Sequence, residues 1–194
     1  MSVNGTPGGS PVRRWAWRVL FLVVVLLALP FAWELLIELR WSSSQHISPY
    51  LRDKLQSEAL KALPSGDVPV GSLVLYGDSV IGKGFNTVLA EGNAGGHAEI
   101  NALSDAMRVV GVARFNAFSR DSLVLVSTYE PCFMCKGALM EARVKHVFFL
   151  KPKPFFYRLR EDARLLLYTL RMQRREPAEL QDSLFRLSEE SRRR

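Results

Sequence analysis

The sequence has few residues that bind transition metals, no internal repeat and no phosphate-binding glycine loop. Its 194 residues include two cysteines and three histidines, too few cysteines for a zinc site built from four of them. The glycine pair at 95–96 is too small a cluster for a P-loop, because the Lys-Ser/Thr pair that should follow it is missing. These absences exclude a repeat protein and a P-loop nucleotidase.

Two short segments nevertheless combine metal ligands with a free carboxylate. The segment HAE begins at His97, and the segment PCFMC begins at Pro131. A catalytic zinc site needs three protein ligands and an open fourth position, and His97, Cys132 and Cys135 provide three ligands. Glu99 lies two residues beyond His97, which is about 200° around a helix, so we expect it to stay off the metal and to transfer protons.

This pattern is typical of zinc-dependent deaminases that act on nucleobases. Zinc lowers the pKa of a bound water from 15.7 to about 7, which gives a hydroxide that can add to a ring carbon bearing an amino group. Glu99 would take a proton from the water and pass it to the ring nitrogen and then to the departing ammonia. Pro131 suits the first turn of a helix, where backbone NH groups favour the thiolates of Cys132 and Cys135. The motifs predict a hydrolytic deaminase with one Zn²⁺ per chain.

Two other interpretations of the cysteine pair are weaker. A Cys-x-x-Cys pair also occurs in thioredoxin-like redox sites, but a His-x-Glu segment upstream is not expected there. A purely structural zinc would require a fourth protein ligand. His46 and His146 lie outside any ligand-spaced cluster, and His146 starts a predicted strand.

The sequence around the motifs resembles the cytidine deaminase superfamily, closest to its branch of bacterial tRNA adenosine deaminases and guanine deaminases. The resemblance covers roughly residues 48–150. It rests on the segments DVPVGSLVL (67–75), VIGKGFN (80–86) and EPCFMCKGA (130–138). It implies a three-layer α/β/α sandwich, a substrate that is a nucleobase, a nucleoside or RNA, and a homodimer.

The same resemblance assigns residues to the substrate. It implies that Asn86 hydrogen-bonds the base, that Val70 and Ala98 line the base pocket, and that the backbone NH of Cys132 helps to stabilise the transition state. Without the resemblance, Asn86 would be interpreted as a turn residue at a strand end.

The sequence also departs from this branch in two places. The segment NAGG (93–96) stands where the branch usually has Asp-Pro-Thr-Ala, in a loop that borders the base pocket. The segment KPKP (151–154) leads directly into a helical pattern, where the family has a loop and a fifth strand. The identity of the substrate is therefore open, and a groove for a folded tRNA is either rebuilt or absent.

Hydrophobic periodicity predicts strands that alternate with helices, as in an α/β sandwich. The predicted strands are 72–76, 80–85, 123–128 and 147–150, and the predicted helices are 50–63, 97–110, 132–143 and 155–175. A turn at Gly77-Asp78 joins the first two strands as a hairpin.

The N-terminal region contains the longest apolar stretch. Residues 19–33 carry no charge, and the extension to residues 15–37 adds only Arg18 and Glu34. About 20 residues cross a bilayer core, and all four tryptophans of the chain flank this stretch, as expected at membrane interfaces. We predict a disordered leader (1–14) and a single-pass membrane anchor (15–41).

A cleavable signal peptide is the competing interpretation, because Arg13 and Arg14 precede the apolar stretch. No small-x-small cleavage site follows it, since Phe31, Trp33 and Leu35 are bulky. The side of the membrane that the catalytic domain faces is open, because three basic residues lie before the span and three within about twenty residues after it.

The remaining chain divides into a predicted deaminase domain (46–152) and a basic helical extension (153–194). Residues 151–194 hold twelve Lys or Arg and seven Asp or Glu. Such a surplus suits nucleic acid or anionic lipid, but an ordinary solvated helical face is an equal interpretation. The alternative function is a non-catalytic membrane module that keeps a zinc-stabilised fold and binds a nucleotide or a partner.

Overall fold

The structure is a computed structural model that describes residues 11–41, 47–173 and 178–193. It divides into two compact units, Met1–Arg52 and Asp53–Arg194. The first unit contains α1 (Pro11–Trp41), a single helix with Pro30 inside it. Residues 1–10 of the expected leader lie outside the described residues. The last four leader residues belong to α1, because proline suits the first turn of a helix.

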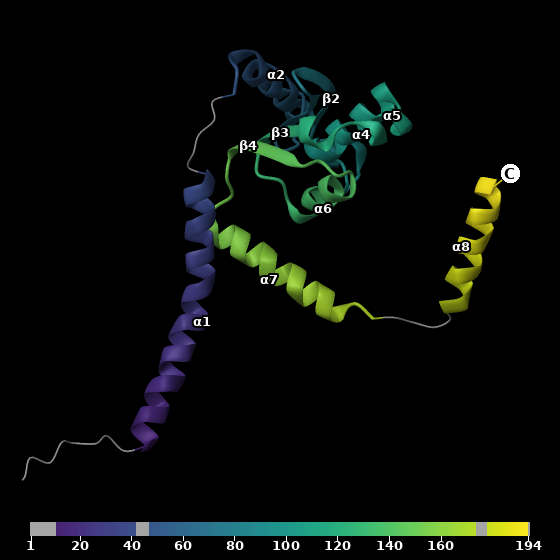
Figure 1. The fold of residues 1–194 in the computed structure, drawn as a ribbon. Helices are drawn as coiled ribbons and strands as arrows, with labels where there is room; N and C mark the ends of the chain where they lie inside the picture. Colours follow the sequence, from purple (N-terminus) through teal and green to yellow (C-terminus); the bar gives the residue numbers. More distant parts are fainter. Residues whose placement is uncertain (1–10, 42–46, 174–177, 194) are drawn as a thin grey trace, which may run out of the picture. The chain divides into compact units, whose positions relative to one another are not determined.

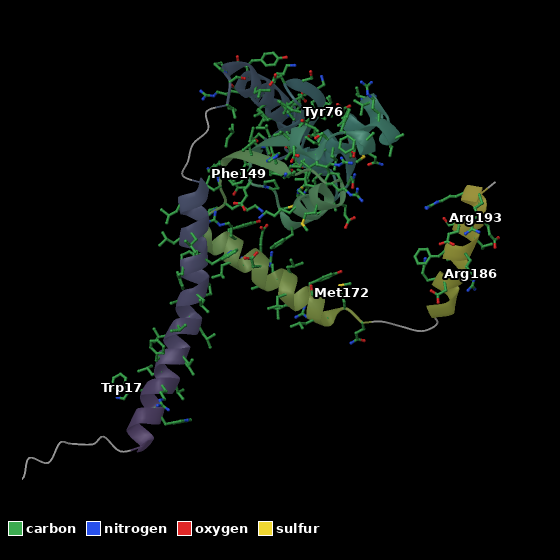
Figure 2. The ribbon with its side chains drawn as sticks, viewed as in Figure 1. Trp17, Tyr76, Phe149, Met172, Arg186 and Arg193 are labelled. Carbon is green, nitrogen blue, oxygen red and sulfur yellow. The ribbon has the colours of Figure 1, made fainter. Side chains whose placement is uncertain are left out.

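Helix α1 exposes a long apolar surface. Its window Trp15–Trp33 has 19 residues, a mean hydropathy of 2.2 and no buried share, and side chains such as Trp17 project from it (Figure 2). The helix is long and apolar enough to cross a bilayer, and a signal sequence near an N-terminus meets the same criteria.

The second unit is built on a mixed sheet, which has four strands in the part of the chain that the structure describes (Figure 1). The strands are β1 (Gly71–Tyr76), β2 (Ser79–Phe85), β3 (Leu123–Tyr129) and β4 (His146–Lys151), in the order β2-β1-β3-β4. Strand β1 pairs antiparallel with β2 and β3, and β3 pairs parallel with β4. The hairpin turns at Gly77, whose φ of 57° favours glycine.

Helices cover both faces of this sheet. Helix α2 (Pro49–Leu60) approaches Gly71, where a Cβ would collide with its backbone. Helix α4 (Ala98–Val110) approaches Gly84 in the same way. Gly84 pairs with Ser72, the neighbour of Gly71 on β1. Since successive residues of a strand face opposite sides, α2 and α4 lie on opposite faces, as in the predicted α/β/α layering.

The core lies between the sheet and α4. Buried side chains from β1, β3 and α4 pack around Phe115, which comes from α5 (Val112–Ala117). Helix α6 (Phe133–Glu141) adds Leu139 to this cluster. Helices α4 and α6 therefore share one face of the sheet, which brings their N-terminal ends together.

The predicted elements are present, but several of their ends differ. Helix α4 begins at Ala98 rather than at His97, and α2 ends at Leu60 rather than at residue 63. Helix α6 begins at Phe133 rather than at Cys132, so Cys132 is the N-cap residue. The short helices α3 (Val88–Glu91) and α5 were not predicted, and the structure also has short 3-10 helices at Leu63–Ser65 and Arg120–Ser122. Helix α7 (Phe155–Arg171) follows β4 directly and ends before residue 175, while α8 (Ala178–Arg193) forms the described C-terminal part.

Candidate metal and catalytic centre

Three side chains meet where α4 and α6 begin. His97 is the N-cap residue of α4, Cys132 is the N-cap residue of α6, and Cys135 lies in the first turn of α6. The His97 Nδ1 atom is 3.5 Å from the Sγ of Cys132 and 3.6 Å from the Sγ of Cys135, and the two sulfurs are 3.6 Å apart.

These separations fit one tetrahedral zinc ion. Zinc binds sulfur at about 2.3 Å and imidazole nitrogen at about 2.0 Å, which places two sulfur ligands about 3.8 Å apart and a sulfur and a nitrogen about 3.5 Å apart. The three observed distances agree with this geometry to within about 0.2 Å, and the ligand atoms all lie within 4.8 Å of one another. Because these three residues make up the cluster in the described part of the chain, a fourth position is left for solvent.

Glu99 lies beside the ligands but outside their cluster. Its side chain is buried, and its Oε2 atom is 3.4 Å from the Sγ of Cys135. Burial raises the pKa of the Glu99 carboxyl above its ordinary value, because the charged form loses solvation. A carboxyl whose pKa is shifted toward neutrality is suited to accept and return a proton.

The start of α6 favours a thiolate at Cys132. The hydrogen bond with the Cys135 thiol, together with backbone NH groups at the helix start, lowers the pKa of Cys132 to about 5. The same hydrogen bond and burial raise the pKa of Cys135. Metal ligands must be deprotonated, and Cys132 is already inclined toward that state.

Asn101 holds the loop before His97 against the end of β2. Its Nδ2 atom donates to the carbonyl of Phe85 at 2.8 Å and to the Oγ1 of Thr87 at 3.0 Å. The NH of Thr87 in turn donates to the carbonyl of Gly96 at 2.7 Å. The sequence analysis missed Asn101 and Thr87, although a polar residue one turn after His97 on the same helix was an available signal.

The residues expected to contact the base lie at this same end of the sheet. The NH of Asn86 donates to the carbonyl of Val70 at 3.2 Å, and its Oδ1 accepts from the NH of Val88 at 3.4 Å. Ala98, which lies between His97 and Glu99 in the chain, is buried. The structure thus brings Asn86, Val70 and Ala98 close to the loop that presents His97.

The buried carboxylate of Asp67 holds the segment that follows Asn86. Asp67 accepts from the NH groups of Leu89 and Ala90 at 2.7 and 3.0 Å, which fixes the start of α3 directly after Asn86. Its third partner is the hydroxyl of Ser65 at 2.7 Å. Sequence analysis did not assign this role to Asp67.

Glu130 connects the segment just before Cys132 to the part of the chain that follows β4. Its carboxylate accepts from the Nζ of Lys136 and from the NH of Lys153, both at 3.0 Å, and lies 3.6 Å from Arg158 on α7. The buried Nζ of Lys153 then donates to Glu161 on α7 at 2.8 and 2.9 Å. The residue that precedes Pro131 therefore fastens the start of α7 beside the metal ligands.

A groove of about 530 Å³ opens at Cys132. Its sides come from the start of α6 and from one face of α7. Its lining residues are Cys132, Phe133, Met134, Glu161, Arg164, Leu165, Leu167, Tyr168 and Arg171.

Comparison with known proteins identifies the family. The family model described as the cytidine and deoxycytidylate deaminase zinc-binding region matches residues 47–151. The tRNA-specific adenosine deaminase of Buchnera aphidicola subsp. Schizaphis graminum is 33% identical over 107 residues, which cover 52% of this chain and 68% of that protein. The tRNA-specific adenosine deaminase 2 of Xenopus laevis is 42% identical over 85 residues, which cover 42% of this chain and 47% of the relative.

A solved structure has the same fold. Guanine deaminase from Bacillus subtilis superposes with a TM-score of 0.56 at 21% identity, covering 74% of this chain and 95% of that one. The family predicted from the motifs and its zinc cofactor are confirmed by the family match and by the His97, Cys132 and Cys135 cluster. The chain belongs to the family of the cytidine and deoxycytidylate deaminase zinc-binding region.

Proposed function

We propose that this chain hydrolyses the exocyclic amino group of adenine in a nucleoside, a nucleotide or RNA, and releases ammonia. The observation that carries the proposal is the arrangement of three zinc ligands with a buried carboxyl 3.4 Å from one of them. Two relatives that are at least 33% identical are named tRNA-specific adenosine deaminases, which favours adenine over other bases.

His97, Cys132 and Cys135 would hold the zinc ion, which supplies a Lewis acid that activates water at neutral pH. Glu99 takes one proton from the attacking water and delivers it to the ring nitrogen. It then takes the second proton from the hydroxyl that has added to the ring carbon and gives it to the amino group, which leaves as ammonia. Its burial supports this role, because a raised pKa makes the carboxyl easier to protonate and so better suited to carry a proton.

The end of β2 is the proposed place for the base. Asn86 would hydrogen-bond the ring, while Val70 and Ala98 would supply apolar contacts. Asn101 and Asp67 support this arrangement, because their hydrogen bonds hold the segments on both sides of Asn86. The loop 93–96 borders the same place, and its NAGG sequence differs from that of the family branch, which leaves the identity of the base open.

The proposal places the enzyme at a membrane. Residues 15–41 would form a single-pass anchor, residues 46–152 the deaminase domain and residues 153–194 a basic helical extension. The exposed apolar surface of α1 and the tryptophans along it support the anchor. By family resemblance, the expected functional unit is a homodimer.

An ammonia-release assay tests the activity. The full-length protein in neutral detergent, loaded with zinc, is supplied in turn with adenosine, guanine, cytidine and a tRNA anticodon stem-loop that contains adenosine. We expect zinc-dependent ammonia release from an adenosine-containing substrate, which stops when a chelator removes the metal. A zinc-loaded, folded protein that releases no ammonia from any of them would favour the non-catalytic binding module.

A further inference from the structure

We propose that one face of α7 binds phosphate groups of the substrate, so that this enzyme acts on a nucleotide or on RNA in preference to a free nucleoside. The inference rests on the proposed deaminase function and deepens it. It assigns Arg164, Tyr168 and Arg171 to a phosphate-binding and base-stacking wall, which nothing in the family motifs includes.

The groove between α6 and α7 starts beside the proposed metal site. It opens at Cys132, one of the zinc ligands, and Phe133 and Met134 line it next to that residue. Its volume of about 530 Å³ lies in the range of ligand pockets, about 300–1,000 Å³. A substrate whose base reaches the metal therefore has room to extend along α7.

Four residues of the groove share one face of α7. Glu161, Arg164, Tyr168 and Arg171 are separated by three, four and three positions, so they lie on one face of the helix. All four line the groove. Arg164 and Arg171 are two turns apart, about 10 Å along the helix, so each of them can contact a phosphate group independently.

Contacts with Glu130 and Lys153 hold the start of α7 in place. Lys153 and Arg158 both contact Glu130, directly before Pro131. Glu161 is paired with the Nζ of Lys153. The negative charge of Glu161 is therefore already matched, and the groove is left with the positive charge of its two arginines.

The chemistry of these side chains identifies the ligand class. Guanidinium groups bind phosphate oxygens through paired, charge-assisted hydrogen bonds. An exposed tyrosine between two arginines gives a base or ribose a surface to stack on, the combination found in channels for single-stranded nucleic acid. Tyr168 is 68% exposed, so its ring is accessible from the groove. A free nucleoside has no anion that could use either arginine.

The test compares substrates with and without phosphate on the full-length, zinc-loaded protein. We measure kcat/KM for adenosine, adenosine 5′-monophosphate and a short oligoribonucleotide with one adenosine. The double variant Arg164→Gln/Arg171→Gln is compared with Arg114→Gln, which removes the charge of an exposed arginine on α5, outside the groove. Zinc content and circular dichroism confirm that each variant is folded.

We expect the wild type to prefer a phosphate-bearing substrate over adenosine by at least about tenfold. The double variant should lose about tenfold or more on that substrate, because charge-assisted hydrogen bonds are removed, and should keep its value for adenosine. A loss confined to the oligoribonucleotide identifies RNA as the phosphate source, and a loss on both identifies a mononucleotide. Equal values for all three substrates, or an equal loss on adenosine, would overturn the inference.

Failure of the proposed function gives a different result. If the wild type deaminates none of the three, the inference is judged by equilibrium binding of the nucleotide and the oligoribonucleotide. Binding that weakens in the double variant, but not in Arg114→Gln, supports the phosphate wall. Binding that is equal in all three proteins overturns it.

Discussion

The carboxylate of Glu99 and the thiol of Cys135 lie 3.4 Å apart, although they come from different helices on the same face of the sheet. This contact places the proposed proton-transfer group beside the three residues of the metal cluster, of which it is not a member. Glu99 is held there by its position in the first turn of α4, a helix whose residues Ala98 and Ala102 pack against β2. The roles of metal binding and proton transfer can therefore be separated by mutation.

Replacing Glu99 with Gln should abolish catalysis while zinc stays bound. The amide keeps the shape of the side chain but cannot accept a proton, and general acid-base groups contribute about 10²- to 10⁴-fold to rates. Ammonia release should fall by at least about 10²-fold, and zinc content measured by mass spectrometry should stay near one per chain. Glu91→Gln, an exposed carboxyl of α3, is the control. Turnover near the wild-type rate in Glu99→Gln would remove Glu99 from the mechanism.

Replacing Glu130 with Ala should destabilise the enzyme markedly. Glu130 and Arg158 are both buried, and removal of the carboxylate leaves buried positive charge without this partner. Loss of one partner of a buried ion pair costs about 3–5 kcal/mol, which corresponds to a melting temperature lower by roughly 6–20 °C. Differential scanning fluorimetry measures the shift.

Glu141→Ala is the matched control for that experiment. Glu141 is the last residue of α6 and is exposed, so its loss should change the free energy of unfolding by no more than about 0.5 kcal/mol. Similar melting temperatures for the two variants would show that the contacts of Glu130 do not fasten the segment just before Cys132.

The zinc ligands and the strands could be predicted from sequence because each has a local signal. His97 and the cysteine pair stand in short motifs whose chemistry is specific. The strand from Leu73 to Leu75 is a short apolar run next to a glycine turn. Cys132 was expected inside the helix, but it caps the helix instead, since the helix begins two residues after Pro131.

The contacts that brace the site have no such signal. Asp67 pairs with Leu89, and Glu130 with Lys153, across more than twenty positions of sequence. One sequence without related ones carries no pattern that joins such residues. Helices α3 and α5 are also too short, at 4 and 6 residues, to show the period of about 3.6 residues on which the sequence prediction depends.

Asp67 should make the stability of the deaminase unit depend on pH. Burial acts to raise the pKa of Asp67, but its hydrogen bonds from Leu89, Ser65 and Ala90 outweigh burial and lower it. A folded-state pKa below the unfolded value stabilises the fold above the unfolded pKa, near pH 4. That stabilisation is lost as the pH falls through the lowered value.

Denaturant unfolding of the wild type and Asp67→Asn between pH 7 and pH 3 measures this effect. The wild type should be the more stable protein at pH 7, and the difference between the two should shrink below about pH 4. Loss of zinc at low pH affects both proteins alike, so the difference isolates Asp67. A difference that stays constant down to pH 3 would show that the Asp67 charge contributes nothing.

Two glycines should respond in opposite ways to the same substitution. A Cβ at Gly84 would collide with the backbone of α4 at Ala98 and Ala102, so Gly84→Ala should push α4 away from β2. Overpacking of this kind costs about 1–3 kcal/mol, and His97 would move with the helix. We therefore expect a lower melting temperature together with weaker zinc binding, measured by competition with a chelator.

Gly137 lies inside α6 with open space at its Cβ position. Gly137→Ala should leave zinc affinity unchanged and stabilise the fold by about 0.5–1 kcal/mol, because alanine favours helix. If Gly84→Ala binds zinc as tightly as Gly137→Ala does, then the close packing of α4 on β2 is not what positions the imidazole.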